Sequence, residues 1–105
     1  MTEPLHSISD LDRVIHEPSR LLLMALLSSV ESADFLFLLT QSRLTKGNLS
    51  VHLSRLEEAG YLEVEKSFRG KIPHTEYRLT PQGKSAFDQY RQALGPIFDT
   101  TKGRG

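Results

Sequence analysis

The spacing of apolar residues along the chain changes at Gly60 from a helical to an alternating pattern, and this change is the strongest constraint on the fold. Before Gly60, Leu49, Leu53 and Leu56 cluster within about 60° around a helical wheel, which predicts an amphipathic helix over residues 45–59. Thr45 suits the N-cap position of that helix, and Gly60 suits the left-handed position just past its end.

Beyond Gly60 the pattern alternates in the manner of half-buried strands. Leu62, Val64 and then Phe68 have charged residues between and around them, and Tyr77 and Leu79 fall on one face of the segment 75–79; the turn at 69–74 between the two segments contains Gly and Pro. The turn and its flanks are basic. The sequence therefore predicts a two-stranded β-hairpin with a basic tip.

Further helices are predicted on both sides of these elements. Leu11, Val14 and Ile15 follow helical spacing, and a second helix starts near Pro18 and carries an apolar run that belongs at the centre of the fold. Asp34 or Ser32 can cap a short helix that follows. Thr80 and Pro81 start a last helix.

This element order predicts an α+β fold, mostly α, of the winged helix-turn-helix type, with terminal helices for dimerisation. We expect one domain over residues 1–105. Within it we expect a core at about 10–80, dimerisation helices at about 5–16 and 81–99, and a loose tail at 100–105.

The composition excludes several classes of protein. Cysteine is absent, no apolar run is long enough for a transmembrane helix, and the acidic N-terminus does not resemble a signal peptide, so we expect a cytoplasmic protein. The four histidines form no metal-binding pair, and neither a nucleophile elbow nor a phosphate-binding glycine loop occurs. We therefore expect no enzyme activity, no metal and no cofactor.

The charge distribution is uneven although the net charge is zero. Residues 1–39 hold two basic and six acidic side chains, whereas residues 40–78 hold seven basic and five acidic ones. This difference is weak evidence for an anionic partner of the middle of the chain.

The outward face of the helix at 45–59 is suited to the major groove of DNA. Its N-terminal half is small and polar, and acids occur only at its far end, at Glu57 and Glu58. An asparagine can read adenine, an arginine guanine, and a valine the thymine methyl group. The candidate base-reading residues are Gly47, Asn48, Ser50, Val51, Ser54 and Arg55. The alternative is an ordinary solvent-facing surface.

Basic and polar residues around that helix are candidates for the DNA backbone. The predicted hairpin, or wing, over 66–78 carries cations that would grip phosphate or reach into the minor groove, although a solubilising loop would look similar. The candidate backbone contacts are Arg43, Thr45, Lys46, Lys66, Arg69, Lys71, His74 and Arg78.

The segments LTKGNLSVHLSRLEEAGYLEVEK and YRLTPQGKSAF together carry a family resemblance. The chain resembles the DNA-binding domain of small MarR-like and ArsR-like transcriptional regulators over roughly residues 10–95. The resemblance implies a homodimeric, sequence-specific DNA-binding regulator. The chain lacks the cysteines of metal-sensing ArsR-like proteins and the extra terminal helices of full-length MarR-like proteins, so their ligand pocket is not carried over.

An apolar stripe on the last helix predicts a dimer interface. Its spacing of three and four residues suits a helix–helix seam, while packing within the monomer is the alternative. We expect the first helix to join it. The candidate interface residues are Leu5, Ile8, Leu11, Ile15, Phe87, Tyr90, Leu94, Ile97 and Phe98. Two-fold symmetry would place two recognition helices on a pseudo-palindromic operator in double-stranded DNA.

The leading interpretation is thus a homodimeric winged-helix transcriptional regulator, and a repressor rather than an activator. A winged-helix module that works mainly through protein–protein contact is the alternative. The sequence leaves a small-molecule effector open and does not identify one.

Overall fold

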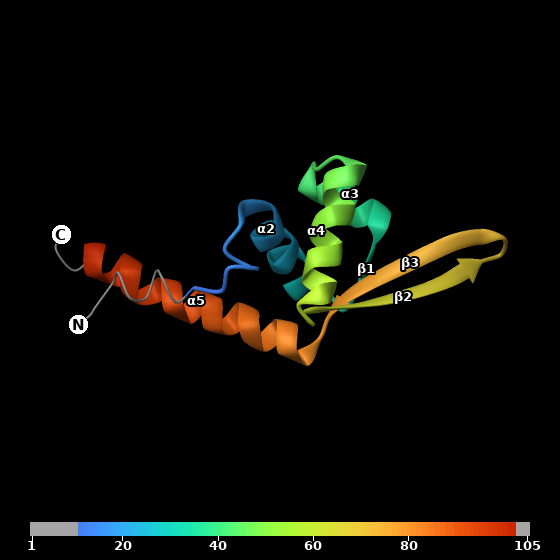
Figure 1. Ribbon diagram of the computed structural model, residues 1–105. Helices are drawn as coiled ribbons and strands as arrows, with labels where there is room; N and C mark the ends of the chain where they lie inside the picture. Colours follow the sequence, from blue (N-terminus) through green and yellow to red (C-terminus); the bar gives the residue numbers. More distant parts are fainter. Residues whose placement is uncertain (1–10, 103–105) are drawn as a thin grey trace.

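The computed structural model describes residues 11–102, with the side chains of 98–102 excepted. Its elements are α2 (Pro18–Ser28), β1 (Ala33–Asp34), α3 (Phe35–Ser42), α4 (Lys46–Glu58), β2 (Leu62–Arg69), β3 (Ile72–Leu79) and α5 (Pro81–Lys102). The predicted α+β winged helix-turn-helix is confirmed (Figure 1).

The hairpin and the last helix extend from the helical body in opposite directions (Figure 1). The described part of the molecule is accordingly elongated, with extents of 58 × 24 × 21 Å. Helix α4 lies between them. This arrangement gives the molecule one end formed by the wing and another formed by the end of α5.

The body has one apolar cluster, to which each of the helices contributes. Leu23, Met24 and Leu27 of α2 are buried, as expected for the central apolar run, and they pack in the same cluster as Leu38 of α3. The buried face of α4 is completely leucine. The predicted face of Leu49, Leu53 and Leu56 is therefore confirmed.

The sheet has three strands in the order β1-β3-β2, where two were expected. The additional strand, β1, pairs Ala33 with Tyr77 and Asp34 with Glu76. Strands β2 and β3 pair continuously from Leu62 and Leu79 out to Arg69 and Ile72, so the hairpin turn is only Gly70–Lys71. The wide turn expected at 69–74 is therefore wrong.

The N-terminal helix expected at 5–16 is also wrong where the structure describes it. Residues 11–17 form turns and bends. The Asp12 carboxylate accepts hydrogen bonds from the backbone N–H groups of Val14 at 2.8 Å and Ile15 at 3.2 Å, as a helix cap does, but only one turn follows, closed by the bond from the His16 N–H to the Asp12 carbonyl at 2.7 Å. Glu17 is extended, with φ of −153°, because a residue that precedes proline disfavours the helical conformation. At the other end, α5 continues to Lys102, so the expected loose tail does not begin at residue 100.

Candidate nucleic-acid interface

Local hydrogen bonds set the start of α4. Helix α3 ends at Arg43, which adopts a left-handed conformation with φ of 61°, and Ser42 Oγ accepts from the N–H of Leu44 at 3.2 Å. Thr45 then caps α4, with its hydroxyl accepting from the N–H of Asn48 at 3.1 Å. The predicted cap is confirmed, and the sharp turn leaves the first turn of α4 exposed.

All six candidate base-reading residues lie on the exposed side of α4. Even Val51, the one larger apolar side chain among them, is 55% exposed. The first turn holds no acid, and a Cβ atom added to Gly47 would meet no heavy atom within 4 Å. A base edge or phosphate could therefore approach this end of the helix closely, and the partial positive charge of a helix N-terminus favours an anion there.

The opposite side of α4 is held by a polar contact with α2 and the N-terminal segment. His52 is half-buried, and its Nδ1 lies 3.1 Å from Arg20 Nη1, while Arg20 Nε donates to the Val14 carbonyl at 2.6 Å. Because the guanidinium group can only donate, His52 Nδ1 acts as the acceptor. His52 is thus a packing histidine that orients α4.

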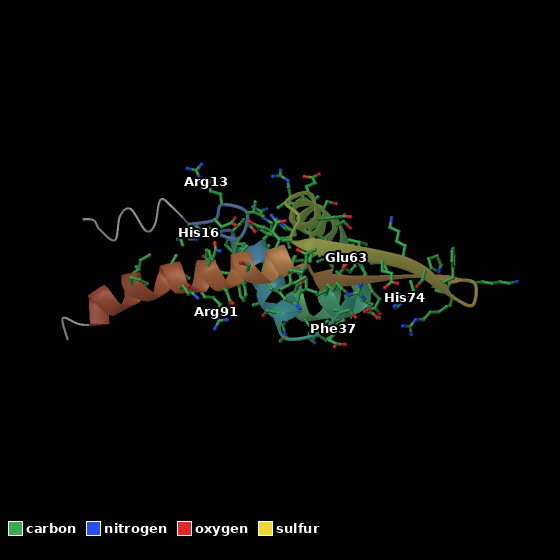
Figure 2. The ribbon with its side chains drawn as sticks, turned by 90° about the horizontal axis from the view of Figure 1, so that it is seen from below. Arg13, His16, Phe37, Glu63, His74 and Arg91 are labelled. Carbon is green, nitrogen blue, oxygen red and sulfur yellow. The ribbon has the colours of Figure 1, made fainter. Side chains whose placement is uncertain are left out.

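Two of the expected backbone-contacting residues, His74 and Arg78, are half-buried and paired with glutamates of the sheet. His74 Nε2 lies 2.7 Å from Glu76 Oε2, and Arg78 lies 3.4 Å from Glu65 and 3.9 Å from Glu63. Both basic residues are half-buried. Figure 2 shows Glu63 nearer the helices than His74 along the hairpin. His74 and Arg78 are therefore already paired with glutamates of the hairpin, unlike the free cations expected from the sequence.

Glu76 is the most constrained carboxylate of the wing. It accepts a hydrogen bond from Ser32 at 2.6 Å, and it also lies near Arg69 at 3.8 Å. The bond from Ser32, followed by the contact with His74, lowers the pKa of Glu76 below its usual value. The negative charge of the Glu76 carboxylate is thus favoured by these contacts and is already paired within the hairpin.

The remaining backbone candidates are exposed. They lie before α4, at its start, and along the outer part of the hairpin, and they are Arg43, Thr45, Lys46, Lys66, Arg69 and Lys71. Their side chains are therefore accessible to the phosphates of a bound duplex.

Four of the residues expected at a dimer interface are buried within their own chain. Phe87 and Tyr90 of α5 are only 8% and 4% exposed, and Leu11 and Ile15 are equally buried, all in the core of the same chain. These four side chains have no surface left for a partner, so packing within the monomer is their role. Leu94 and Ile97 are half-buried, whereas Leu5, Ile8 and the Phe98 side chain lie outside the described residues.

The N-terminal segment, residues 11–17, is tied to the rest of the chain by two tyrosines, Tyr61, which the sequence did not single out, and Tyr90, which was expected at a dimer interface. Tyr61 donates a short hydrogen bond to the Asp12 carboxylate, and burial together with this bond raises the pKa of Tyr61 to about 12. The Tyr90 hydroxyl lies 2.8 Å from His16 Nδ1. A hollow of about 280 Å³ lies beside these contacts, lined in part by Leu11, Gln89 and Ala93. Nothing in the local spacing of these residues could have revealed the pairs.

The fold and its exposed helix define the molecule as a winged-helix protein. A family model described as winged helix DNA-binding domain matches residues 19–98, and the chain belongs to this family. The match covers α2 through most of α5, including the whole hairpin.

Individual relatives agree with this assignment. An uncharacterized protein of Methanocaldococcus jannaschii is 35% identical over 79 residues, which is 74% of this chain and 85% of the relative. A transcriptional regulator homologue from Pyrococcus horikoshii OT3 superposes with a TM-score of 0.86 at 26% identity, covering 95% of this chain and 98% of the other.

A protein from Enterococcus faecalis V583, placed in the MarR family of transcriptional regulators, gives a TM-score of 0.75 at 25% identity. The match covers 100% of this chain and 96% of the other. The resemblance to MarR-like regulators seen in the sequence is thereby confirmed, and these two structural relatives are regulators rather than enzymes.

The described part of the chain has neither a membrane-spanning helix nor a cluster of metal-binding side chains. No helix between residues 11 and 102 is both long and apolar enough to cross a membrane. Among the side chains of residues 11–97, no three His, Asp or Glu groups are placed to hold one metal ion.

Proposed function

We propose that the protein is a sequence-specific, double-stranded DNA-binding transcriptional regulator that acts in the cytoplasm as a repressor. The observation that carries the proposal is the first half of α4, where exposed polar side chains and an acid-free helix N-terminus face outward. In this arrangement Asn48, Val51 and Arg55 read base edges in the major groove. Repression needs only occupancy of an operator, because a bound duplex is closed to competing proteins.

We further propose that the wing holds the flanking DNA through Lys66 and Lys71, with Arg69 as an additional contact. These three cations are exposed, whereas the acids of the wing are already engaged by His74, Arg78 and Arg69 itself. Phosphate contacts of this kind add affinity without sequence preference, because every phosphate is chemically alike.

The proposed state of assembly is a homodimer joined through the outer part of α5. Leu94 and Ile97 are half-buried residues in the second half of α5, Leu94 also packs against the monomer core, and the end of α5 extends away from the helical body (Figure 1). A two-fold axis there would present two copies of α4 to the half-sites of a pseudo-palindromic operator. A small-molecule effector, whose identity we do not propose, would have room in the hollow between the N-terminal segment and α5.

Selection of binding sites from random double-stranded DNA tests the main proposal directly. The selected duplex and a scrambled duplex would then be titrated at several salt concentrations with the full chain. We expect tight binding to the selected duplex, a specificity ratio on the order of a thousandfold, and affinity that falls steeply with added salt.

Single substitutions separate base reading from phosphate binding. Asn48→Ala and Arg55→Ala should each reduce discrimination at one base pair by about 1–3 kcal/mol. Lys71→Ala should weaken binding to all sequences alike and reduce the salt slope by about one. Lys84→Ala, which removes an exposed lysine from the start of α5, is the matched control and should change neither.

The same experiments distinguish the regulator from the alternative, a protein-interaction module. If no motif is enriched and binding to any duplex is weak, the chain is a protein-interaction module. If a motif is enriched but all three variants bind like the wild type, the reading face lies elsewhere on the molecule.

A further inference from the structure

Large apolar side chains are exposed at the very tip of the hairpin. Phe68 is 70% exposed and Ile72 is 71% exposed, although the rest of the hairpin places its apolar residues toward the core. The tip lies far from the helical body, so neither side chain contributes to the monomer core (Figure 1).

The register places these two side chains on opposite faces of the ribbon. Phe68 is directly opposite Pro73, whereas Ile72 is opposite Arg69. Since successive residues of a strand point to opposite faces, Ile72 shares the face of Arg69, and Phe68 is on the other face. The tip is therefore apolar on both sides.

The charge around the tip is uniformly positive or neutral. The segment KSFRGKIPHT, residues 66–75, contains no acid, and its Lys66 and Lys71 are exposed. An apolar end within a ring of cations fits a polyanion that also offers apolar walls. The minor groove of DNA has both features, because deoxyribose lines its sides and phosphates line its rims.

The thickness of the tip determines how it would enter that groove. Stacked sheets lie about 10 Å apart, so the side chains on one face of a sheet occupy roughly 5 Å. A ribbon with large side chains on both faces is therefore about 10 Å thick. The minor groove of ordinary B-DNA is only about 6 Å wide. A tip with Phe68 and Ile72 on its two faces can enter only a groove that opens.

We infer that Phe68 and Ile72 form an apolar wedge that widens the minor groove beside the operator and selects flanking DNA for its deformability. The inference rests on the proposed function, since it needs α4 to hold the duplex. Flexible steps such as TA and CA/TG open at lower cost than a stiff A-tract, whose minor groove is narrow. The wedge therefore reads a flank without hydrogen bonds to its bases.

The test compares duplexes that share one core site and differ only in the flank beneath the wing. One flank is an A-tract, and the other contains TA and CA/TG steps. For the full-length wild-type chain we expect the flexible flank to be bound on the order of tenfold more tightly. Phe68→Ser and Ile72→Ser should each reduce this ratio severalfold, and the double variant should bring it close to one.

Two controls separate the wedge from other causes. Leu36→Ser removes an equally exposed apolar side chain, 69% accessible, from α3 and should leave the flank preference intact. The salt slope should stay unchanged in Phe68→Ser, because an apolar contact releases no counterions, but should fall in Lys71→Ala.

Each outcome has a definite meaning. If the wild type binds no duplex in a salt-dependent way, the proposed function fails and the wedge fails with it. If the wild type binds its core site but shows no flank preference, or if Phe68→Ser and Ile72→Ser retain the wild-type preference, only the wedge is overturned.

Discussion

Replacing Gly83 with alanine should destabilise the protein, although alanine normally strengthens a helix. Gly83 is buried in the first turn of α5, and a Cβ atom there would lie 2.3 Å from the carbonyl oxygen of Tyr61. Ordinary van der Waals contact starts at 3.4 Å, so α5 and the start of β2 would have to separate by up to about 1 Å.

Hydrogen bonds at the same place make that movement costly. The Tyr61 carbonyl accepts from the N–H of Thr80 at 3.0 Å, and the Thr80 hydroxyl donates to the Gly60 carbonyl at 2.6 Å. The same hydroxyl caps α5 by accepting from the N–H of Gly83 at 2.9 Å. Overpacking costs about 1–3 kcal/mol and each weakened hydrogen bond about 1 kcal/mol, against a helix gain of about 0.5–1 kcal/mol. We expect a net loss of roughly 2–4 kcal/mol.

Urea unfolding followed by circular dichroism measures this loss. The comparison must be made at one protein concentration, because a dimer would make the midpoint concentration-dependent. Gly47→Ala is the matched control: Gly47 is also in the first turn of a helix, but nothing lies within 4 Å of its added Cβ atom. Equal or greater stability of Gly83→Ala relative to the wild type would refute the argument from close approach.

Three further results are expected from other sites. Gly47→Ala should raise the free energy of unfolding by about 0.5–1 kcal/mol, because alanine favours the helix and nothing obstructs its methyl group. The same substitution should weaken operator binding, because the methyl group lies where the DNA would approach, and a fluorescence titration with the operator measures this loss of affinity. Tyr61→Phe removes the bond to Asp12 and should cost about 1–2 kcal/mol at neutral pH. The folded pKa of Tyr61 is raised to about 12 from 10.0, so the wild type should lose stability as the pH rises between these values. Urea unfolding at several pH values in this range should show a smaller loss of stability for Tyr61→Phe than for the wild type. The folded pKa of Glu76 is lowered, so its contribution to the free energy of unfolding is present above its ordinary pKa and is lost as the pH falls. Acid unfolding should therefore find the stability of Glu76→Gln less sensitive to acid than that of the wild type. Equal acid sensitivity of the two proteins would contradict the role of Ser32 and His74.

Local patterns in the sequence were sufficient for the helix-turn-helix itself. Thr45 and Asp34 cap their helices, and Gly60 has the expected positive φ, 85°, because each of these roles depends only on the residue and its immediate neighbours. The leucine face of α4 was equally clear, since its period is set by helix geometry alone.

Features that depend on contacts distant in sequence were not predictable in the same way. Strand β1 has only two residues and is defined by its pairing with β3, so no period could reveal it. The pairing of Arg78 with Glu63 and Glu65 depends on the strand register, which determines the side chains that share a face. The stripe on α5 was visible, but whether Phe87 and Tyr90 face their own core or a partner depends on how the N-terminal segment folds over them.

The joint at Thr80 has a mechanical consequence for the proposed dimer. One threonine fixes the end of α4, the start of β2 and the start of α5 at a single point, so these elements move together. Helix α5 has 22 residues and is thus a lever of about 33 Å. If α5 tilts by about 5° about its far end, where the proposed dimer contact lies, the Thr80 end and the recognition helix attached to it move by about 3 Å. This displacement is close to the rise of one base pair, about 3.4 Å. Small changes in the angle between two such levers would therefore shift the half-site spacing that the pair can span.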